Sequence, residues 1–201
     1  MNVEPESRES RVSLPHPRTS GGQPLLDVLG RRHSTREYSG RELSLQLQSD
    51  LLWASFGINR AESGGRTAPS ARNWQEIDIY IARADGLFRY EPKPHGLQRV
   101  GTHDIRAATG MQDFVSQAPL NLLYVADLSK VDSTDPVERR FYCAADAGFI
   151  AQNVYLFCAS EGLATVVRGL LDRRALAQIM QLHRRQRVLL AQTVGYAADS
   201  T

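Results

Sequence analysis

The sequence lacks the motifs that mark several large classes of enzyme. It has only five histidines and two cysteines in 201 residues, and no two histidines have the spacing of a zinc or iron site. Neither a P-loop nor a Gly-x-Gly-x-x-Gly motif occurs, and no set of serine, histidine and aspartate stands out for nucleophilic catalysis. We therefore expect no metal site, no P-loop nucleotide site and no hydrolytic triad.

Long apolar runs and an excess of one charge are also missing. No stretch approaches the ~18 uninterrupted apolar residues of a membrane span, and residues 1–23 contain no apolar segment of the signal-peptide kind. The 24 basic and 22 acidic residues are scattered along the chain and leave a net charge of only +2. This balance argues against nucleic acid as a partner. We expect a soluble, cytoplasmic protein that binds neither nucleic acid nor a membrane.

Length and composition favour a single domain with a sizeable core, because 42% of the residues are hydrophobic. Residues 1–23 are rich in proline, glycine and polar residues, and they predict a flexible or draped N-terminal arm before a domain over residues 24–201. Cys143 and Cys158 fall on one predicted helix, where a rise of ~1.5 Å per residue separates them by roughly 22 Å. They are too far apart to pair within one chain, which favours free thiols in a reducing compartment.

The hydrophobic pattern mixes helical and strand periodicity. It predicts helices over residues 24–32, 44–56, 136–161 and 172–182, short helices over 104–109 and 112–117, and strands over 77–82, 87–90, 97–100, 120–126, 163–167 and 188–194. The 77–82 strand alternates as a half-buried strand does, and the helix over 136–161 is apolar around much of its circumference after Tyr142. Such a helix is buried in a core or in a dimer interface. The fold class that follows is α+β.

Three segments carry residues suited to binding a ligand. Residues 31–38, RRHSTREY, combine guanidinium groups and hydroxyls that suit a phosphate monoester, although a solvated basic surface has the same composition. Residues 68–75, APSARNWQ, form a predicted turn between a helix and a strand, and a plain polar loop is the alternative. Residues 146–169 join the C-terminal part of the long helix to a strand through Gly162.

Together these segments resemble the FMN-dependent nitroreductase family. The residues of the second and third segments are most similar to the branch that includes azoline-forming (thiazole or oxazole) peptide dehydrogenases. The resemblance implies a nitroreductase-like fold, with a mixed and mainly antiparallel sheet flanked by helices and a long buried central helix. It also implies a homodimer with two FMN molecules at the interface.

The resemblance assigns flavin-binding positions, and none to a metal. Those expected to hold the phosphate, the ribityl chain and the pyrimidine edge are Arg32, His33, Ser34 and Arg36. Those expected to reach the partner subunit's flavin are Pro69, Ser70, Ala71 and Asn73. Gln112 is expected near the pyrimidine, and the strand end expected to present backbone amides to N5 and O4 comprises Val166, Val167, Arg168 and Gly169. A cation at Arg36 would also stabilise the charge that develops when the ring accepts hydride.

Each assignment has a plainer alternative. Arg36 could pair with Glu37 or Glu42, and Gln112 could be an exposed helix residue. Arg168 could form a surface salt bridge with Asp172.

The chain departs from the family's commoner pattern in two places. The acidic residue that many relatives carry at the strand end is replaced by Arg168, and no basic segment follows Tyr196. Arg31, Arg66 and Arg72 are the candidates to replace that phosphate anchor.

The implied function is reduction of nitroaromatic, quinone or similar acceptors with NAD(P)H, by ping-pong hydride transfer at flavin N5. No side chain is predicted to act as the catalytic group, since the flavin supplies the reactivity. Two alternatives stay open. One is an azoline-type peptide dehydrogenase, and the other is a non-catalytic flavin-binding or sensing module, which the shortened C-terminus and the replaced acidic residue suggest.

Overall fold

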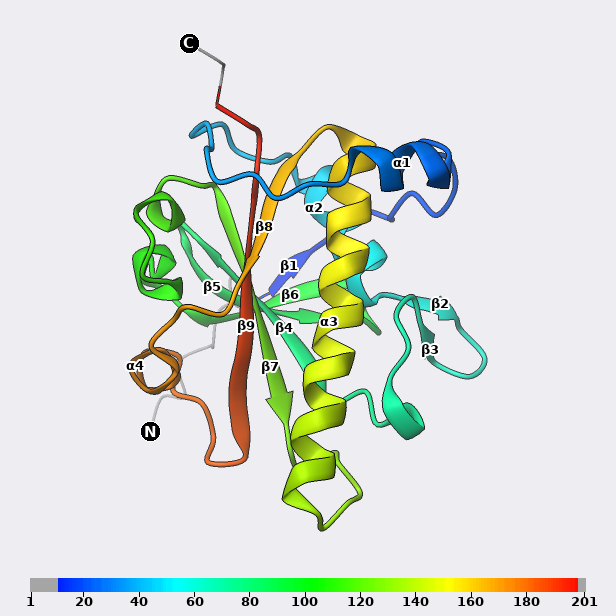
Figure 1. Cartoon of the computed structure of the whole chain (residues 1–201), viewed down its shortest axis with the longest axis vertical. Coiled ribbons are helices and arrows are strands. Elements are labelled where there is room, and N and C mark those ends of the chain that lie inside the picture. The colour runs from blue at the N-terminus through cyan, green and yellow to red at the C-terminus, as the bar shows by residue number, and fades with distance from the viewer. Residues whose placement is uncertain (1–10, 199–201) are drawn as a thin grey trace, which may run out of the picture.

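The computed structural model describes residues 11–198 and places a seven-stranded sheet at the centre of the molecule (Figure 1). All neighbouring strands of this sheet run antiparallel. In spatial order the strands are β1 (Arg11–Ser13), β6 (Gly96–Gly101), β5 (Gly86–Glu91), β4 (Ile77–Arg83), β7 (Leu120–Asp127), β9 (Gln186–Gly195) and β8 (Ala164–Arg168). A separate hairpin pairs β2 (Ile58–Arg60) with β3 (Gly65–Arg66).

Helices cover both faces of the sheet. They are α1 (Leu25–Arg31), α2 (Leu45–Phe56), α3 (Pro136–Glu161) and α4 (Arg173–Ile179), with 3₁₀ turns η2 (Ala71–Asn73), η3 (Arg106–Thr109) and η4 (Asp113–Ser116). The larger core lies between the sheet and helices α2 and α3, and a second core lies between the sheet and α4 (Figure 1). The mixed fold with a mainly antiparallel sheet, expected from the sequence, is confirmed.

Capping residues mark the helix boundaries. Asp135 precedes Pro136 and accepts a hydrogen bond from the Val137 N–H, and Gly162 ends α3 in a left-handed conformation with φ of 70°. Asp172 accepts from two backbone N–H groups at the start of α4, as its position predicts. The predicted helix over 136–161 therefore has the observed bounds of α3.

Strand β4 differs from its predicted half-buried state. Ile77, Ile79 and Ile81 pack on the α2 and α3 side, as the alternation predicts. Tyr80 and Ala82 on the opposite face are also buried, because α4 and the segment around η3 cover that side. Only Asp78 and Arg83, near the two ends of β4, are partly exposed.

The long helix α3 buries one face and exposes apolar side chains on another. Cys143 and Cys158 are buried free thiols on this helix, as predicted. Phe141 is 66% exposed and Phe149 is 47% exposed. No helix among residues 11–198 has the length and apolar character needed to cross a membrane.

Residues 11–23 are attached to the domain in the structure, which fits the draped form of the predicted arm and contradicts the flexible form. Strand β1 pairs with β6, and Leu14 is buried in the main core. The Arg18 backbone N–H and Nε donate to Asp50 of α2 at 2.8 and 2.6 Å. The proline-rich segment that suggested an arm therefore runs along the surface of the domain. Residues 1–10 of the predicted arm lie outside the described residues.

Candidate functional site

The basic segment after α1 lies against the free edge of the sheet. Within residues 11–198, β8 is the last strand of the sheet, so one side of its backbone has no partner strand there. The Thr35 N–H donates to the Thr165 carbonyl of β8 at 3.0 Å, and the Ser39 N–H donates to the Tyr196 carbonyl at 2.9 Å. The chain leaving α1 therefore crosses beside β8 and the last residues of β9 (Figure 1). This places Arg32–Arg36 next to the predicted flavin-facing strand.

Tyr155 of α3 joins this segment to β8. Its hydroxyl accepts a hydrogen bond from the Val167 N–H at 2.9 Å and shares another with Ser34 Oγ at 2.8 Å. The Arg32 guanidinium lies 5.4 Å from the centre of the Tyr155 ring. The structure thus brings Arg32, Ser34 and Val167 together around one phenol group, which is only 8% exposed. The sequence analysis missed Tyr155, although a tyrosine on the buried face of α3 needs a partner for its hydroxyl.

The basic groups of this segment are free to meet an anion. Arg31 and Arg36 form no side-chain hydrogen bond or ion pair with another residue in the described range 11–198. The alternative pairing of Arg36 with Glu37 or Glu42 is therefore not formed there. His33 is exposed, and its Nδ1 lies 2.7 Å from the Arg31 carbonyl.

The other proposed phosphate anchors are engaged elsewhere. Arg66 donates to Gln75 Oε1 at 2.8 Å and lies over the Phe56 ring. Arg72 pairs with Glu138 at 2.8 Å. Of the three candidate phosphate anchors, Arg31 is the one that lies beside the Arg32–Arg36 segment.

Arg168 is buried rather than on the surface, so the predicted alternative of a surface salt bridge to Asp172 is wrong. Its side chain extends from β8 to neutral acceptors: Thr193 Oγ1 at 3.0 Å, the Thr109 carbonyl at 2.7 Å, Thr109 Oγ1 at 3.3 Å and Asn121 Oδ1 at 3.0 Å. The residue is 4% exposed. Burial lowers the pKa of Arg168 to about 10, so it stays protonated at neutral pH. Asp172 is occupied in capping α4.

Gln112 lies beside Arg168, and the alternative of an exposed helix residue is also wrong. Its side-chain oxygen is buried and has no hydrogen-bond partner in the described structure. A Cβ at Gly110 would lie 1.9 Å from Arg168 Nη1 and 2.8 Å from Gln112 Oε1. Gly110 therefore allows the loop to approach the guanidinium closely. An unsatisfied acceptor at this point fits a ligand that supplies a donor.

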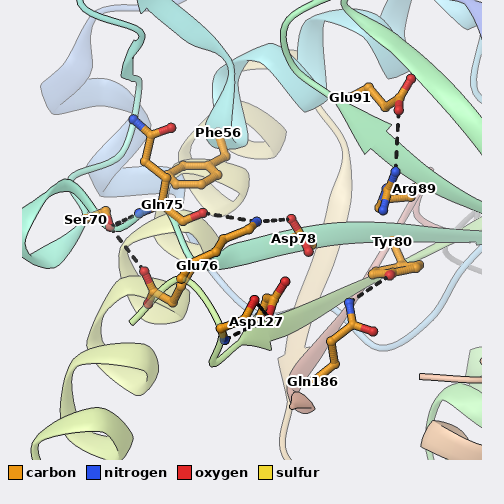
Figure 2. A network of polar contacts seen from close by, with 12 residues as sticks. Phe56, Ser70, Gln75, Glu76, Asp78, Tyr80, Arg89, Glu91, Asp127 and Gln186 are labelled. Atoms are coloured by element: carbon orange, nitrogen blue, oxygen red, sulfur yellow. Dashed lines mark hydrogen bonds and ion pairs between the residues drawn. The ribbon is translucent and has the colours of Figure 1, made fainter. Parts of the chain in front are cut away.

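The second predicted segment, residues 68–75, forms a tight turn that contacts two carboxyl groups. The Ala71 N–H donates to Asp146 Oδ2 of α3 at 2.8 Å, and Ser70 Oγ donates to Glu76 Oε2 at 3.2 Å. The Gln75 N–H donates to Ser70 Oγ at 2.8 Å, as Figure 2 shows. Arg72 has φ of 49°. Such a backbone is costly for residues other than glycine, so the turn depends on these contacts.

Glu76 and Asp146 form a buried acid pair that the sequence analysis did not identify. Glu76 is 0% exposed and Asp146 is 2% exposed. Burial raises the pKa of Glu76, and the neighbouring Asp146 carboxyl raises it further. The same surroundings raise the pKa of the Cys143 thiol to about 12, so this cysteine is not a thiolate nucleophile at neutral pH.

Beyond this turn, polar side chains contact one another. Figure 2 shows Arg89 with Glu91 at 3.5 Å and Gln186 Nε2 with the Tyr80 hydroxyl at 3.4 Å. Lys130 pairs with Asp78 at 2.7 Å. Side chains engaged in this way offer little to a ligand.

The predicted site residues fall into two groups along α3. Asp146 holds the Pro69–Asn73 turn, and Tyr155 holds the Arg32–Arg36 segment. At ~1.5 Å per residue, these two positions are roughly 14 Å apart along the helix axis. Within one chain, the turn and the basic segment therefore contact different levels of α3 (Figure 1).

Comparison with known proteins agrees with this architecture. The model of the Nitroreductase family matches residues 29–196. A curated relative from Methanocaldococcus jannaschii, provisionally named a nitroreductase, is 31% identical over 181 residues, which are 85% of this chain and 90% of the relative. A crystal structure of a Ralstonia eutropha JMP134 protein, provisionally assigned as a nitroreductase, is 45% identical with a TM-score of 0.91, and the match covers 95% of this chain and 91% of that chain.

A more distant structure shares the fold. It is the NADPH:FMN oxidoreductase from Vibrio harveyi complexed with NAD⁺, with 18% identity and a TM-score of 0.67. The match covers 88% of this chain and 69% of that chain.

Proposed function

The chain belongs to the Nitroreductase family, and from this premise we propose that it is an FMN-dependent oxidoreductase working as a homodimer. NAD(P)H is the electron donor, and nitroaromatic, quinone or related unsaturated compounds are the acceptors. The observation that carries the proposal is the convergence of Arg32, Ser34 and Val167 on Tyr155, beside the free edge of β8. Arg31 and Arg36, which form no ion pair within residues 11–198, lie there beside the last strand of the sheet, and this arrangement suits a phosphate joined to a planar ring.

The residues present fit FMN. Arg32 and Arg36, with Arg31 beside them, would hold the phosphate, since guanidinium groups meet phosphate oxygens through two parallel hydrogen bonds. Ser34 would contact the ribityl chain, and the buried Gln112 oxygen would accept a hydrogen bond from the pyrimidine edge. The end of β8 at Arg168 and Gly169 would offer backbone N–H groups to the ring. The bound flavin supplies hydride-accepting chemistry, and the protein supplies binding, orientation and electrostatics.

A dimer explains why the predicted site residues are divided. The Pro69–Asn73 turn and the basic segment of its own chain are anchored roughly 14 Å apart along α3, and we propose that the turn completes the partner's site. Exposed apolar side chains on α1 and α3 support a protein interface on this side of the molecule: Leu25, Leu26, Leu29, Phe141 and Phe149.

The test is the visible spectrum of the purified protein, after incubation with FMN and removal of excess. NADH or NADPH is added without oxygen, and an acceptor such as a quinone follows. We expect a flavin spectrum that bleaches with the nicotinamide and returns with the acceptor. Flavin that binds but stays oxidised would contradict the reductase function and favour a peptide dehydrogenase or a binding module. Failure to bind FMN at all would contradict the whole proposal.

Arg36→Ala tests the site within the same experiment. Losing a hydrogen bond to a charged group costs about 1.5–3 kcal/mol, so FMN affinity should fall at least about tenfold. Arg174→Ala is the matched control, because Arg174 is exposed on α4, away from the basic segment. Equal affinity in both variants would remove Arg36 from the site.

A further inference from the structure

Arg168 is a buried cation for which the described chain provides no carboxylate partner. Its four hydrogen bonds go to hydroxyl, amide and carbonyl oxygens of Thr193, Thr109 and Asn121. Removing a guanidinium from water without a counter-charge is unfavourable, and neutral acceptors offset this only in part. The arrangement is therefore poorly explained by fold stability alone.

The surrounding contacts hold the charge in one position. Asn121 and Thr193 are themselves hydrogen-bonded to each other at 2.7 Å, and both lie on strands of the central sheet. Gly110 brings its loop so close that a Cβ there would overlap the guanidinium. The cation is thus rigid and removed from solvent, which is the condition under which a fixed charge acts strongly on its surroundings.

The backbone of the same residue lies at the end of β8, where the proposed function places the flavin ring. Val167, one residue before, has its N–H directed to Tyr155 and toward the Arg32–Arg36 segment. Arg168 itself points to the opposite side of the strand, near the Phe114 ring. Its charge therefore lies on the other side of β8 from Tyr155, near the Gln112 oxygen that is proposed to meet the pyrimidine edge.

We propose that Arg168 is an electrostatic tuning residue that stabilises the negatively charged forms of the bound flavin. This inference rests on the proposed function. Transfer of a hydride, which is two electrons and one proton, to the neutral oxidised ring adds one negative charge. A fixed cation favours that charged product over the neutral reactant, so it raises the reduction potential. Four of the five guanidinium N–H groups donate to protein oxygens, so the proposed effect acts mainly through the charge.

Arg168→Gln removes the charge and keeps polar atoms, and Arg174→Gln removes an exposed charge as the control. Sulfite is the probe, because it adds to flavin N5 and leaves an anionic adduct. We expect sulfite affinity to fall at least tenfold in Arg168→Gln and to stay within twofold in Arg174→Gln. For a two-electron couple, tenfold corresponds to a midpoint potential about 30 mV lower.

Asn121→Asp is the second variant, in case Arg168→Gln does not fold. It places a carboxylate against Arg168 Nη2, where the amide oxygen now lies at 3.0 Å, and neutralises the charge while keeping the arginine. We expect the same loss of sulfite affinity and the same direction of potential shift. A folded variant that binds FMN and retains wild-type sulfite affinity would overturn the role of Arg168. Wild-type protein that does not bind FMN would instead overturn the proposed function.

Discussion

Removal of the Tyr155 hydroxyl should destabilise the protein measurably even without a ligand. Tyr155→Phe loses the hydrogen bonds to Ser34 Oγ and to the Val167 N–H, which measure 2.8 and 2.9 Å. At a net contribution of about 1 kcal/mol each, the loss is about 2 kcal/mol. For a protein of this size, that lowers the melting temperature by about 4–8 °C. The phenylalanine ring fills the same space, so no cavity adds to this value.

The assay is urea unfolding of the flavin-free protein followed by circular dichroism. Tyr80→Phe is the matched control, because the Tyr80 ring is also buried but its hydroxyl makes only a long contact of 3.4 Å with Gln186. We expect a change below about 0.5 kcal/mol for that control. If the two variants lose the same free energy, Tyr155 is not the residue that joins the basic segment to β8.

Two further changes test the packing around the site. Gly110→Ala should lower the free energy of unfolding in urea by about 1–3 kcal/mol, because the new Cβ would overlap Arg168 Nη1. Gly148→Ala is the control, since a Cβ there meets open space on α3 and the change should be neutral or stabilising. A neutral Gly110→Ala would contradict the close approach of the loop to Arg168. Burial raises the pKa of Glu76 above its ordinary value of 4.5. The protonated carboxyl therefore stabilises the fold fully below pH 4.5. This stabilisation is lost as the pH rises through the pKa of the folded state. Glu76→Gln should therefore lose less stability than the wild type between pH 5 and pH 8, and an unchanged pH dependence would show that Glu76 is not protonated in the fold.

Local patterns predicted most of the fold because they depend on neighbours in the sequence. The capping residues Asp135 and Gly162 mark the two ends of the long helix, and apolar periodicity predicts the core strands. The burial of the β4 face that carries Tyr80 and Ala82 could not be predicted, because it depends on the packing of α4 against the sheet. The segment before residue 24 was assigned to an arm, since a three-residue strand such as β1 has no periodicity to recognise.

The site was predicted in part. The family resemblance assigns Arg32, Ser34 and Val167 to one flavin site, and they lie together in the structure. The Tyr155 hydroxyl that connects them could not be predicted, because its partners lie far away in the sequence. The buried state of Arg168 had a signal that was not used. In a strand, alternate residues share a face, and Arg168 is in phase with the buried Val166. The acid pair of Glu76 and Asp146 joins two elements and leaves no local pattern.

The decisive measurement is a crystal structure of the FMN-reconstituted protein. We expect a dimer in which the FMN phosphate contacts Arg32 and Arg36 and the ring lies along the end of β8. We also expect the partner's Pro69–Asn73 turn to close the site from the other side. Flavin bound away from β8, or a site completed without the partner, would refute the proposed dimeric flavin site.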